Sequence, residues 1–452
     1  MSEQIPRVLL AGSNSGCGKT TVTCAVLGGL AGRGLRVGAF KCGPDYIDTM
    51  FHSRITGLPS TNLDRFFFDE NTVNFLLARS GSGCDLSVIE GVMGYYDGLG
   101  PGKTAASTYE VARSTRTPVI LVVNAKGASL SALAVLHGFS SFCPDSGIRG
   151  VLFNQCADAA YPALAQAVLE RFEGRIRPLG YLPRMKDCAL ESRRLGLVTA
   201  DQVKGLEEKL EALAKQAQST VDLDGLISLA AQAPPVQYAP IHLPQYPPVR
   251  IAVAKDAAFC FYYEDNLRAL REMGAQLILF SPLSGTDLPP NIQGLYLGGG
   301  YPELYARPLS ENSRMRSAVR AALEKGLPCI AECGGFMYLT ERIGGFPMVG
   351  ALPGGCFDTG KLVRFGYVSL KAKVNNLLCR AGEEIRGHEF HYWDAEEPGG
   401  DFTAVKPSGK SWDCVTATQT LYAGYPHLPF YADPSFAKNF YKACLKEGAK
   451  HV

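Results

Sequence analysis

The stretch that decides the fold is Gly12-Ser13-Asn14-Ser15-Gly16-Cys17-Gly18-Lys19-Thr20. It follows an apolar run over 7–11 and opens a helical pattern over 19–33. A strand, a glycine-rich turn and then Gly-Lys-Thr at a helix start is the context of a phosphate-binding loop. Ser13 occupies the first glycine position of the standard spacing, so Gly12 lies one residue early. A chance glycine-rich turn is the alternative interpretation.

The loop predicts which residues contact ATP. Backbone amides and the helix N-terminus would surround the phosphates, with Lys19 on the β- and γ-phosphates and the Thr20 hydroxyl on Mg²⁺. Asn154 follows a later apolar run and is a candidate contact for the adenine, with a loop cap as the alternative. The full set of expected nucleotide contacts is Gly12, Ser15, Gly16, Gly18, Lys19, Thr20, Thr21 and Asn154.

Two acidic segments follow later strands of the same pattern. Cys42-Gly43-Pro44-Asp45-Tyr46-Ile47-Asp48 comes after one apolar run, and Glu90 ends another before a glycine turn. Open α/β sheets bind ligands at the carboxyl ends of their strands, and magnesium prefers oxygen ligands. We therefore expect Asp48 and Glu90 to join Thr20 in holding Mg²⁺. Each acid alone is equally well explained as a helix cap or a solvated loop residue.

Composition indicates an ordinary globular protein. The 452 residues are 46% hydrophobic and 19% charged, with a net charge of +2, which gives no electrostatic reason to expect nucleic acid or an anionic membrane as partner. No apolar run approaches the roughly 20 residues that span a bilayer, and no secretory signal is visible, so we expect a cytoplasmic protein. The fourteen cysteines contain no Cys-x-x-Cys pair, which argues against structural zinc.

The chain length predicts two domains, both α/β. Strands over 7–11, 36–41, 86–90, 118–124, 150–154 and 178–182 alternate with helical stretches, the pattern of a parallel sheet covered by helices. Six prolines between 234 and 248 predict an extended linker. The pattern restarts with strands over 250–254, 276–280, 292–297 and 328–332 and a helix over 263–273. We therefore expect domains at 1–235 and 249–452, joined by a linker at 236–248.

A second reactive feature is Ala331-Glu332-Cys333-Gly334-Gly335. Cys333 directly follows an apolar strand and precedes two glycines, the arrangement of a nucleophile on a sharp turn. The amide of Gly334 would be one oxyanion donor, and the turn containing Gly299 and Gly300 would supply others. His388, His391 and His427 are the candidate bases downstream. A buried core cysteine is the alternative interpretation.

These segments resemble the cobyrinic acid a,c-diamide synthase family over nearly the full length. The resemblance rests on 12–21, 41–48, 62–66, 89–98, 193–197, 259–266, 297–304, 331–339 and 387–392. The run Tyr-Leu-Gly-Gly-Gly-Tyr-Pro-Glu at 296–303, followed by Ala-Glu-Cys-Gly-Gly, is highly specific. The first half is also similar to dethiobiotin synthetase, which shares the early glycine. The resemblance implies a P-loop NTPase-like domain followed by a class I glutamine amidotransferase domain of flavodoxin-like α/β fold.

The resemblance also implies a reaction. ATP would convert acetate carboxylates of a tetrapyrrole into acyl phosphates, and ammonia released from glutamine at Cys333 would form the amides. This is carbon–nitrogen ligase chemistry of cobalamin biosynthesis, with ATP and Mg²⁺ as cofactors. The family's Tyr-x-His segment matches Tyr425-Pro426-His427, which selects His427 as the base. Many triad glutaminases place a glutamate two residues after that histidine, where this chain has Pro429, so the third triad member stays open.

The expected partners are the tetrapyrrole polycarboxylate and L-glutamine, with a homodimer left open. Because the macrocycle is polyanionic, we expect Lys41, Asp45, Tyr46, Arg193 and Arg194, all in matching segments, to bind it. Two alternatives remain. One is the same chemistry on nickel-sirohydrochlorin or sirohaem, and the other is a non-catalytic P-loop regulator with an inactive glutaminase domain.

Overall fold

The computed structural model describes residues 1–186, 188, 203 and 205–449. The chain divides into two compact units, Met1–Ile241 and His242–Val452, here called the N-terminal and C-terminal units. Each unit has its own buried apolar clusters, formed by residues of that unit. The bounds of the domains and linker expected from sequence stay a prediction.

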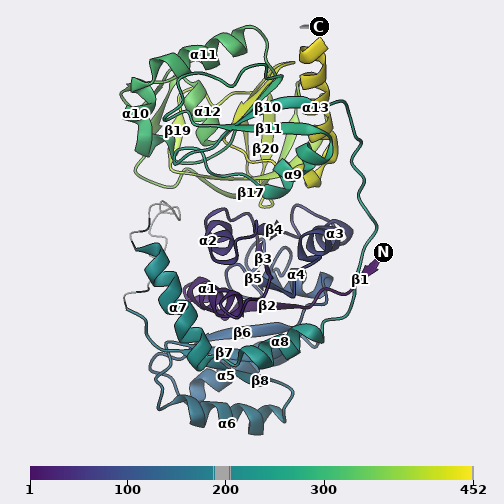
Figure 1. The fold of residues 1–452 in the computed structure, drawn as a ribbon, viewed down its shortest axis with the longest axis vertical. Helices are drawn as coiled ribbons and strands as arrows, with labels where there is room; N and C mark the ends of the chain where they lie inside the picture. Colours follow the sequence, from purple (N-terminus) through teal and green to yellow (C-terminus); the bar gives the residue numbers. More distant parts are fainter. Residues whose placement is uncertain (187, 189–202, 204, 450–452) are drawn as a thin grey trace. The chain divides into compact units, whose positions relative to one another are not determined.

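The N-terminal unit is built on a seven-stranded parallel sheet in the order β4-β3-β5-β2-β6-β7-β8 (Figure 1). The strands are β2 Arg7–Gly12, β3 Val37–Cys42, β4 Thr61–Leu63, β5 Leu86–Glu90, β6 Val119–Asn124, β7 Ile148–Asn154 and β8 Arg177–Leu182. Successive residues of β2, such as Leu9 and Leu10, point to opposite faces of the sheet and are both fully buried, so both faces are covered. This burial explains the continuous apolar runs in the sequence.

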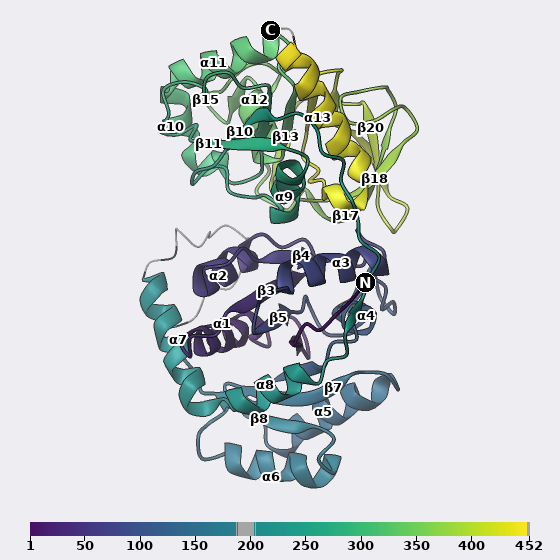
Figure 2. The ribbon, with the colours of Figure 1, turned by 45° about the vertical axis from the view of Figure 1, so that its right-hand side comes forward.

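The helices of this unit are α1 Lys19–Ala31, α2 Ile47–Thr56, α3 Glu70–Gly81, α4 Thr108–Ser114, α5 Leu130–Phe142, α6 Tyr161–Phe172, α7 Leu206–Thr220 and α8 Leu223–Ala231. Helix α7 runs alongside α1 in both ribbon views (Figures 1 and 2). Gly28 of α1 permits this approach, because a Cβ there would stand 2.8 Å from the Ala214 Cβ. The phosphate loop thus leads into a helix that is packed on a second helix as well as on the sheet.

The predicted linker is partly ordered by backbone pairing. Strand β9, Val236–Gln237, pairs antiparallel with β1, Ser2–Glu3. The amide of Ala239 then donates to Asn71 Oδ1 at 2.6 Å. Further along, Tyr246 donates its amide to the Met273 carbonyl at 2.9 Å, inside the C-terminal unit. The proline-rich stretch is therefore held by backbone contacts to a unit at each end.

The C-terminal unit contains a six-stranded sheet in the order β11-β10-β12-β13-β23-β22, parallel except for β22. Its strands are β10 Val249–Ala254, β11 Ala275–Phe280, β12 Gly294–Leu297, β13 Cys329–Glu332, β22 Thr416–Ala417 and β23 Leu421–Gly424. The helices and 3-10 turns are α9 Glu264–Glu272, η2 Pro302–Tyr305, α10 Ala306–Glu311, α11 Ser313–Glu324, α12 Gly334–Leu339, η3 Phe430–Ala432 and α13 Pro434–Gly448.

Two smaller sheets in this unit are absent from the sequence prediction. One has the order β15-β14-β16-β19 and the other the order β18-β17-β20-β21. Their strands are β14 Arg342–Ile343, β15 Phe346–Pro347, β16 Gly355–Asp358, β17 Arg364–Ala372, β18 Glu384–His391, β19 Trp393–Ala395, β20 Phe402–Val405 and β21 Ser411–Cys414.

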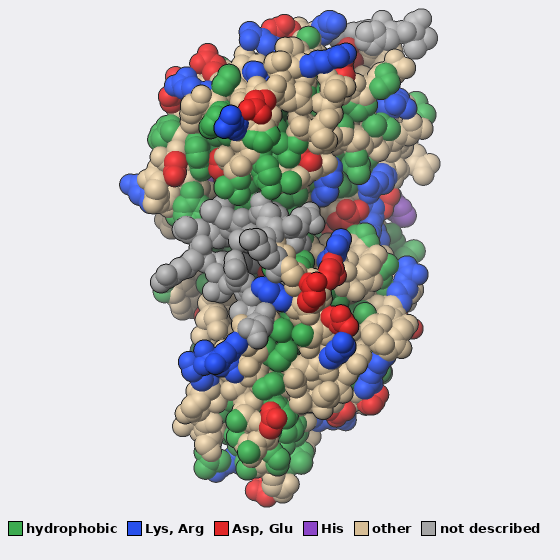
Figure 3. All heavy atoms as spheres, turned by 60° about the vertical axis from the view of Figure 1, so that its left-hand side comes forward, with side chains coloured by type: hydrophobic (Ala, Val, Ile, Leu, Met, Phe, Trp, Pro, Cys, Tyr) green, Lys and Arg blue, Asp and Glu red, His purple; other side chains and the backbone are tan. Residues whose placement is uncertain are grey.

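Among the described residues no helix has the length and apolarity needed to cross a membrane. Basic and acidic side chains are interspersed on the face shown in Figure 3.

Candidate active sites

The phosphate loop has the backbone geometry that its glycines suggest. Gly18, which directly precedes α1, has φ 91°, and Gly16 has φ 83°, both in the left-handed region that favours glycine. A Cβ on Gly18 would lie 2.0 Å from Asn154 Nδ2, and that same nitrogen donates to the Cys17 carbonyl at 2.9 Å. Asn154 therefore supports the loop from below; its contact with adenine stays a prediction.

Lys19 lies beneath the exposed crest of the loop, with a side chain that is nearly buried. Its Nζ donates to the Met93 carbonyl at 2.6 Å, in the turn that follows β5. Burial, followed by the charge of Lys41, lowers the pKa of Lys19, while Glu90 and Asp48 oppose that shift. The lysine is thus held at the loop by a contact that a phosphate oxygen could replace.

A cluster of buried charges lies at the carboxyl ends of β3 and β5. Glu90, which is fully buried, accepts from Thr20 Oγ1 at 2.8 Å and from Lys41 Nζ at 2.9 Å. Lys41 and Glu90 face each other in the register of these strands, and Lys41 also pairs with Asp48 Oδ2 at 2.7 Å. Burial and the Asp48 charge oppose ionisation of Glu90, but Lys41 and His52 hold its pKa below the ordinary value.

This cluster fits a magnesium ion. Thr20, Asp48 and Glu90 supply a hydroxyl and two carboxylates, all oxygen donors of the kind that Mg²⁺ prefers. The Thr20 hydroxyl already lies 2.8 Å from a Glu90 oxygen, beside the lysine of the phosphate loop. The three residues expected to hold the metal are therefore brought together, although the metal itself stays a prediction.

His52 is a member of this cluster that the sequence prediction missed. Its Nε2 lies 2.7 Å from Glu90 Oε2, and its Nδ1 lies 3.3 Å from Ser60 Oγ, with both side chains buried. His52 and Asp48 are four residues apart on α2, a spacing that places them on one helix face. That spacing was the signal available in the sequence.

The residues expected to bind the macrocycle do not all lie in one place. Lys41 belongs to the buried cluster, whereas Asp45 Oδ1 accepts the amides of Ile47 and Asp48 at 2.9 and 3.1 Å, which caps the start of α2. Tyr46 is buried next to it. Arg193 and Arg194 lie outside the described residues. These substrate contacts stay predictions.

Cys333 occupies a strained turn between β13 and α12. Its φ of 48° is rare for a residue with a side chain, and Gly334 and Gly335 follow directly. A Cβ on Gly335 would lie 2.2 Å from the Leu297 carbonyl oxygen, so the close approach of this turn to β12 requires glycine. Burial, then the charge of Glu303, raises the pKa of the Cys333 thiol. A thiol of this kind needs a base to remove its proton.

The turn of Gly299 and Gly300, predicted to supply oxyanion donors and called the oxyanion turn, lies against the turn of Cys333. The Gly300 nitrogen is 3.0 Å from where a Cβ of Gly334 would stand, so the two turns are in contact. The Gly299 amide donates to the Phe261 carbonyl at 3.2 Å. Gly300 and Gly334 are therefore better placed as donors, and a role for Gly299 would require that hydrogen bond to break.

His427 follows β23 and reaches the oxyanion turn. A Cβ on Gly299 would lie 2.5 Å from His427 Cε1 and 3.3 Å from Nε2, so this edge of the ring abuts the turn. His388 stacks on His427 with ring centres 4.9 Å apart, and Tyr263 hydroxyl lies 2.9 Å from His388 Nδ1. Burial, then the His427 charge, lowers the pKa of His388 well below its ordinary value. His388 is thus a neutral neighbour of the predicted base.

A third histidine forms a separate buried pair. His391 Nδ1 donates to the Trp393 carbonyl at 2.6 Å, which leaves Nε2 facing Glu389 Oε2 at 3.7 Å. The His391 ring lies flat on Tyr425 with centres 3.8 Å apart. The sequence prediction offered His391 as a base but did not identify Glu389 as its partner.

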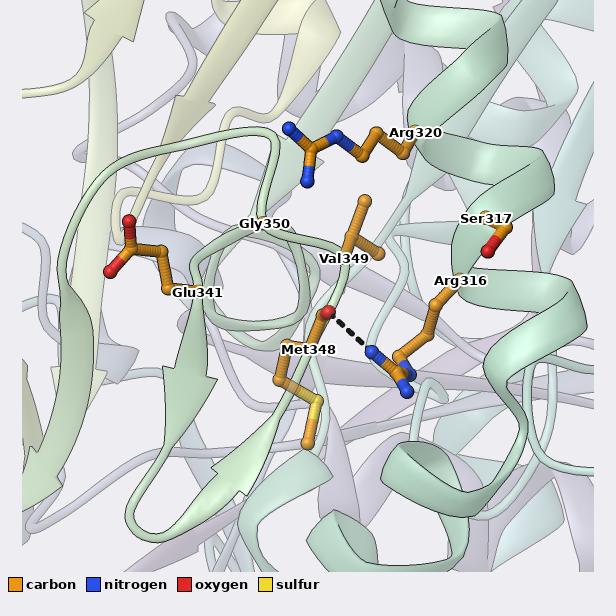
Figure 4. Close-up of a pocket in the computed structure, with 7 residues that line it drawn as sticks. All are labelled: Arg316, Ser317, Arg320, Glu341, Met348, Val349 and Gly350. Carbon is orange, nitrogen blue, oxygen red and sulfur yellow. Dashed lines mark hydrogen bonds between the residues drawn. The ribbon is translucent and has the colours of Figure 1, made fainter.

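A cavity of about 350 Å³ lies in the C-terminal unit, lined by seven residues of that unit. Figure 4 shows Arg316 and Arg320 of α11 lining it opposite Glu341 and the segment Met348–Gly350. Arg316 donates to the Met348 carbonyl at 2.9 Å, and Arg320 pairs with Glu324 at 2.9 Å. None of the residues expected at either site lines this cavity.

Comparison with known proteins identifies both units. Residues 8–197 match the CobQ/CobB/MinD/ParA nucleotide binding domain, and residues 250–435 match the CobB/CobQ-like glutamine amidotransferase domain. Three similar relatives bear the name cobyrinate a,c-diamide synthase. The proteins from Listeria monocytogenes serotype 4b (strain F2365) and serovar 1/2a (strain ATCC BAA-679 / EGD-e) are 41% and 40% identical, over 94% and 97% of this chain and 96% and 99% of theirs. The protein from Dehalococcoides mccartyi (strain CBDB1) is 38% identical over 96% of this chain and 97% of its own. With a nucleotide-binding α/β unit followed by a class I glutamine amidotransferase unit, this chain belongs to the cobyrinate a,c-diamide synthase family.

Proposed function

We propose that this protein is a ligase that uses ATP and glutamine to amidate the a- and c-acetate side chains of cobyrinate. The observation that carries the proposal is the presence of two distinct chemical sites in one chain. The first is a phosphate loop beside a buried cluster of Thr20, Lys41 and Glu90. The second is the strained turn of Cys333, which touches the Gly299–Gly300 turn against which His427 lies. The names of the relatives supply the substrate, and the reaction would take place in the cytoplasm.

The cysteine site would release ammonia. The Cys333 proton moves to His427 Nε2 while the sulfur attacks the amide carbon of glutamine and forms a carbon–sulfur bond. The Gly300 and Gly334 amides would stabilise the resulting oxyanion. The carbon–nitrogen bond then breaks as Nε2 returns the proton to the leaving ammonia. Water hydrolyses the thioester to glutamate and restores the thiol.

The phosphate-loop site would activate the carboxylate. An acetate oxygen of the macrocycle attacks the γ-phosphorus of ATP, ADP leaves, and ammonia then displaces phosphate from the acyl phosphate to give the amide. Lys19 would offset charge on the transferred group, while Thr20, Asp48 and Glu90 would hold magnesium, which supplies further charge neutralisation. Lys41, Asp45, Tyr46, Arg193 and Arg194 are proposed to orient the macrocycle.

The glutaminase assignment is tested with Cys333→Ala. We expect glutamine-dependent synthesis to fall below detection while synthesis from high ammonium salt continues, because ammonia bypasses this site. Cys260→Ala, which removes a partly exposed thiol of the same unit, is the matched control and should keep both activities. Glutamine-dependent turnover by Cys333→Ala would contradict the assignment.

The ATP assignment is tested with Lys19→Ala. We expect loss of synthesis with either nitrogen source, since removing one contact to developing charge typically costs about 3 kcal/mol, or 100-fold in rate. Lys215→Ala, an exposed lysine on α7 that pairs with Glu211, is the control.

Mass spectrometry of products from cobyrinate, sirohaem and nickel-sirohydrochlorin tests the identity of the macrocycle. Amidation of only the latter two would refute the cobyrinate assignment.

A further inference from the structure

We infer that Glu332, the residue immediately before the nucleophile, is the acid that positions His427 for glutamine hydrolysis. This inference rests on the proposed glutaminase site. The chain has Pro429 two residues after the histidine, where a glutamate stands in many triad enzymes, and proline cannot supply a carboxylate. The structure places Glu332 Oε2 3.7 Å from His427 Nδ1, with both side chains at most 3% exposed.

The carboxylate of Glu332 is fixed by two further contacts. Its Oε1 accepts the amide of Leu428 at 3.0 Å, and its Oε2 accepts the Tyr296 hydroxyl at 3.2 Å. Leu428 directly follows the histidine, so the first contact ties the segment that carries the base to the strand that carries the nucleophile. Burial, then the Glu332 charge, raises the pKa of Tyr296 well above its ordinary value, so this phenol remains a hydrogen-bond donor.

Strand alternation explains how adjacent residues can have separate roles. Ile330 lies in the apolar cluster on one side of the sheet, whereas Ala331 and Cys333 lie in the cluster on the other. Glu332 therefore points to the side of Ile330 and Tyr296, away from the thiol. At the strand end, the Cys333 amide donates to the Gly424 carbonyl at 2.8 Å, which holds β13 against the strand that leads to His427.

The two ring nitrogens of His427 face different neighbours. Nδ1 faces Glu332, while the Cε1–Nε2 edge abuts Gly299 at the oxyanion turn. A proton on Nδ1 leaves Nε2 free to accept the thiol proton, and a carboxylate at Nδ1 favours that tautomer and stabilises the imidazolium that forms. The 3.7 Å separation is longer than a hydrogen bond, as contacts of this kind often are before substrate binds.

The test compares Glu332→Gln, Glu332→Asp and Tyr296→Phe in the full-length enzyme. Glutamine at 332 keeps an acceptor for the Leu428 amide but removes the charge and turns an N–H toward Nδ1. We expect kcat for glutamine hydrolysis to fall by about 100-fold or more, with KM for glutamine within about threefold and ammonia-dependent synthesis unchanged. Aspartate retains the charge and should restore at least about tenfold of the lost kcat.

Tyr296→Phe is the matched control, because it removes a hydrogen bond to the same oxygen and leaves the charge. It should lower kcat by no more than about threefold. The inference is overturned if Glu332→Gln retains near-normal kcat, if its loss lies in KM alone, if aspartate restores nothing, or if Tyr296→Phe is equally impaired. If Cys333→Ala still hydrolyses glutamine, the proposed glutaminase site fails instead, which separates the two ideas.

Discussion

The missing side chain of Gly299 leaves room for the imidazole of His427, the predicted base. A methyl group at Gly299 would overlap His427 Cε1 at 2.5 Å, so Gly299→Ala must displace the imidazole. Overpacking of this kind typically costs about 1–3 kcal/mol. We expect glutamine-dependent synthesis to drop by about 10- to 100-fold, with ammonia-dependent synthesis preserved. Gly345→Ala is the control, since nothing lies within 4 Å of a Cβ at Gly345. Equal activities of the two variants would show that the ring can move without loss.

Glu303 gives the C-terminal unit a pH-dependent stability. Burial, with a contribution from the Asp358 charge, raises its pKa from the ordinary 4.5 to about 7. Between these values the unfolded chain has lost the proton that the folded protein keeps, so stability falls as pH rises from about 4.5 to about 7. For a shift of this size the loss is at most about 3 kcal/mol.

Denaturant unfolding of wild type and Glu303→Gln across this pH range measures the effect. We expect the variant to lack most of the decline and therefore to gain stability relative to wild type as pH rises. Glu311→Gln, at an exposed position on α10, serves as the control for losing a carboxylate. Parallel pH profiles for wild type and Glu303→Gln would refute the assignment.

The residues predicted from sequence were those with a local signal. Glycine turns at strand ends lie next to Lys19, Thr20 and Glu90. Cys333 lies between a strand and two glycines. In each case the adjacent sequence indicates a functional residue. Glu332 carried no such signal, because its partner lies almost a hundred residues away and is reached only through strand pairing.

At the level of elements, β7 supports the phosphate loop through Asn154. Asn154→Ala removes the hydrogen bond to the Cys17 carbonyl and opens space under Gly18. A net loss of about 1 kcal/mol in loop order corresponds to roughly fivefold weaker ATP binding. We expect this rise in Kd by calorimetry, with glutamine hydrolysis unaffected.

The neighbouring strand offers a matched control. Asn124 ends β6 in register with Asn154, but its Oδ1 accepts the Lys126 amide at 2.9 Å instead of supporting the loop. Asn124→Ala should therefore leave ATP affinity within about twofold of wild type. A larger effect at Asn124 than at Asn154 would show that the adenine, or another part of the nucleotide, lies nearer β6.

The strands that were predicted, all in the two main parallel sheets, lie within two residues of their predicted bounds, because continuous apolar runs flanked by turns are typical of parallel strands. The strands β14–β21 of the two smaller sheets were not predicted. Most have only two to four residues, whereas the nine-residue β17 and the eight-residue β18 are partly exposed, so no continuous apolar run marks any of them. Strand β4 is buried but has only three residues, too few for an apolar run to mark it.

At the level of the whole molecule, the two units have separate cores. The apolar clusters of the C-terminal unit draw their buried members from 249–444, with Leu243 and Tyr246 packed against them. We therefore expect a chain of residues 242–452 expressed alone to unfold in one cooperative transition. Differential scanning calorimetry of this fragment is the measurement. A broad, non-cooperative transition would show that its core depends on the N-terminal unit.

None of the fourteen cysteines, all of which lie among the described residues, forms a disulfide, and Cys84, Cys143 and Cys260 are the partly exposed ones. Cys333 is buried, and its raised pKa keeps it in the unreactive thiol form. A general alkylating dye would thus label the three partly exposed cysteines and leave Cys333 unmodified, whereas an electrophilic glutamine analogue would bind at the glutamine site and react with Cys333. Selective modification of Cys333 therefore depends on the shape of the reagent rather than on the intrinsic reactivity of the thiol. The three partly exposed cysteines can carry spectroscopic labels independently.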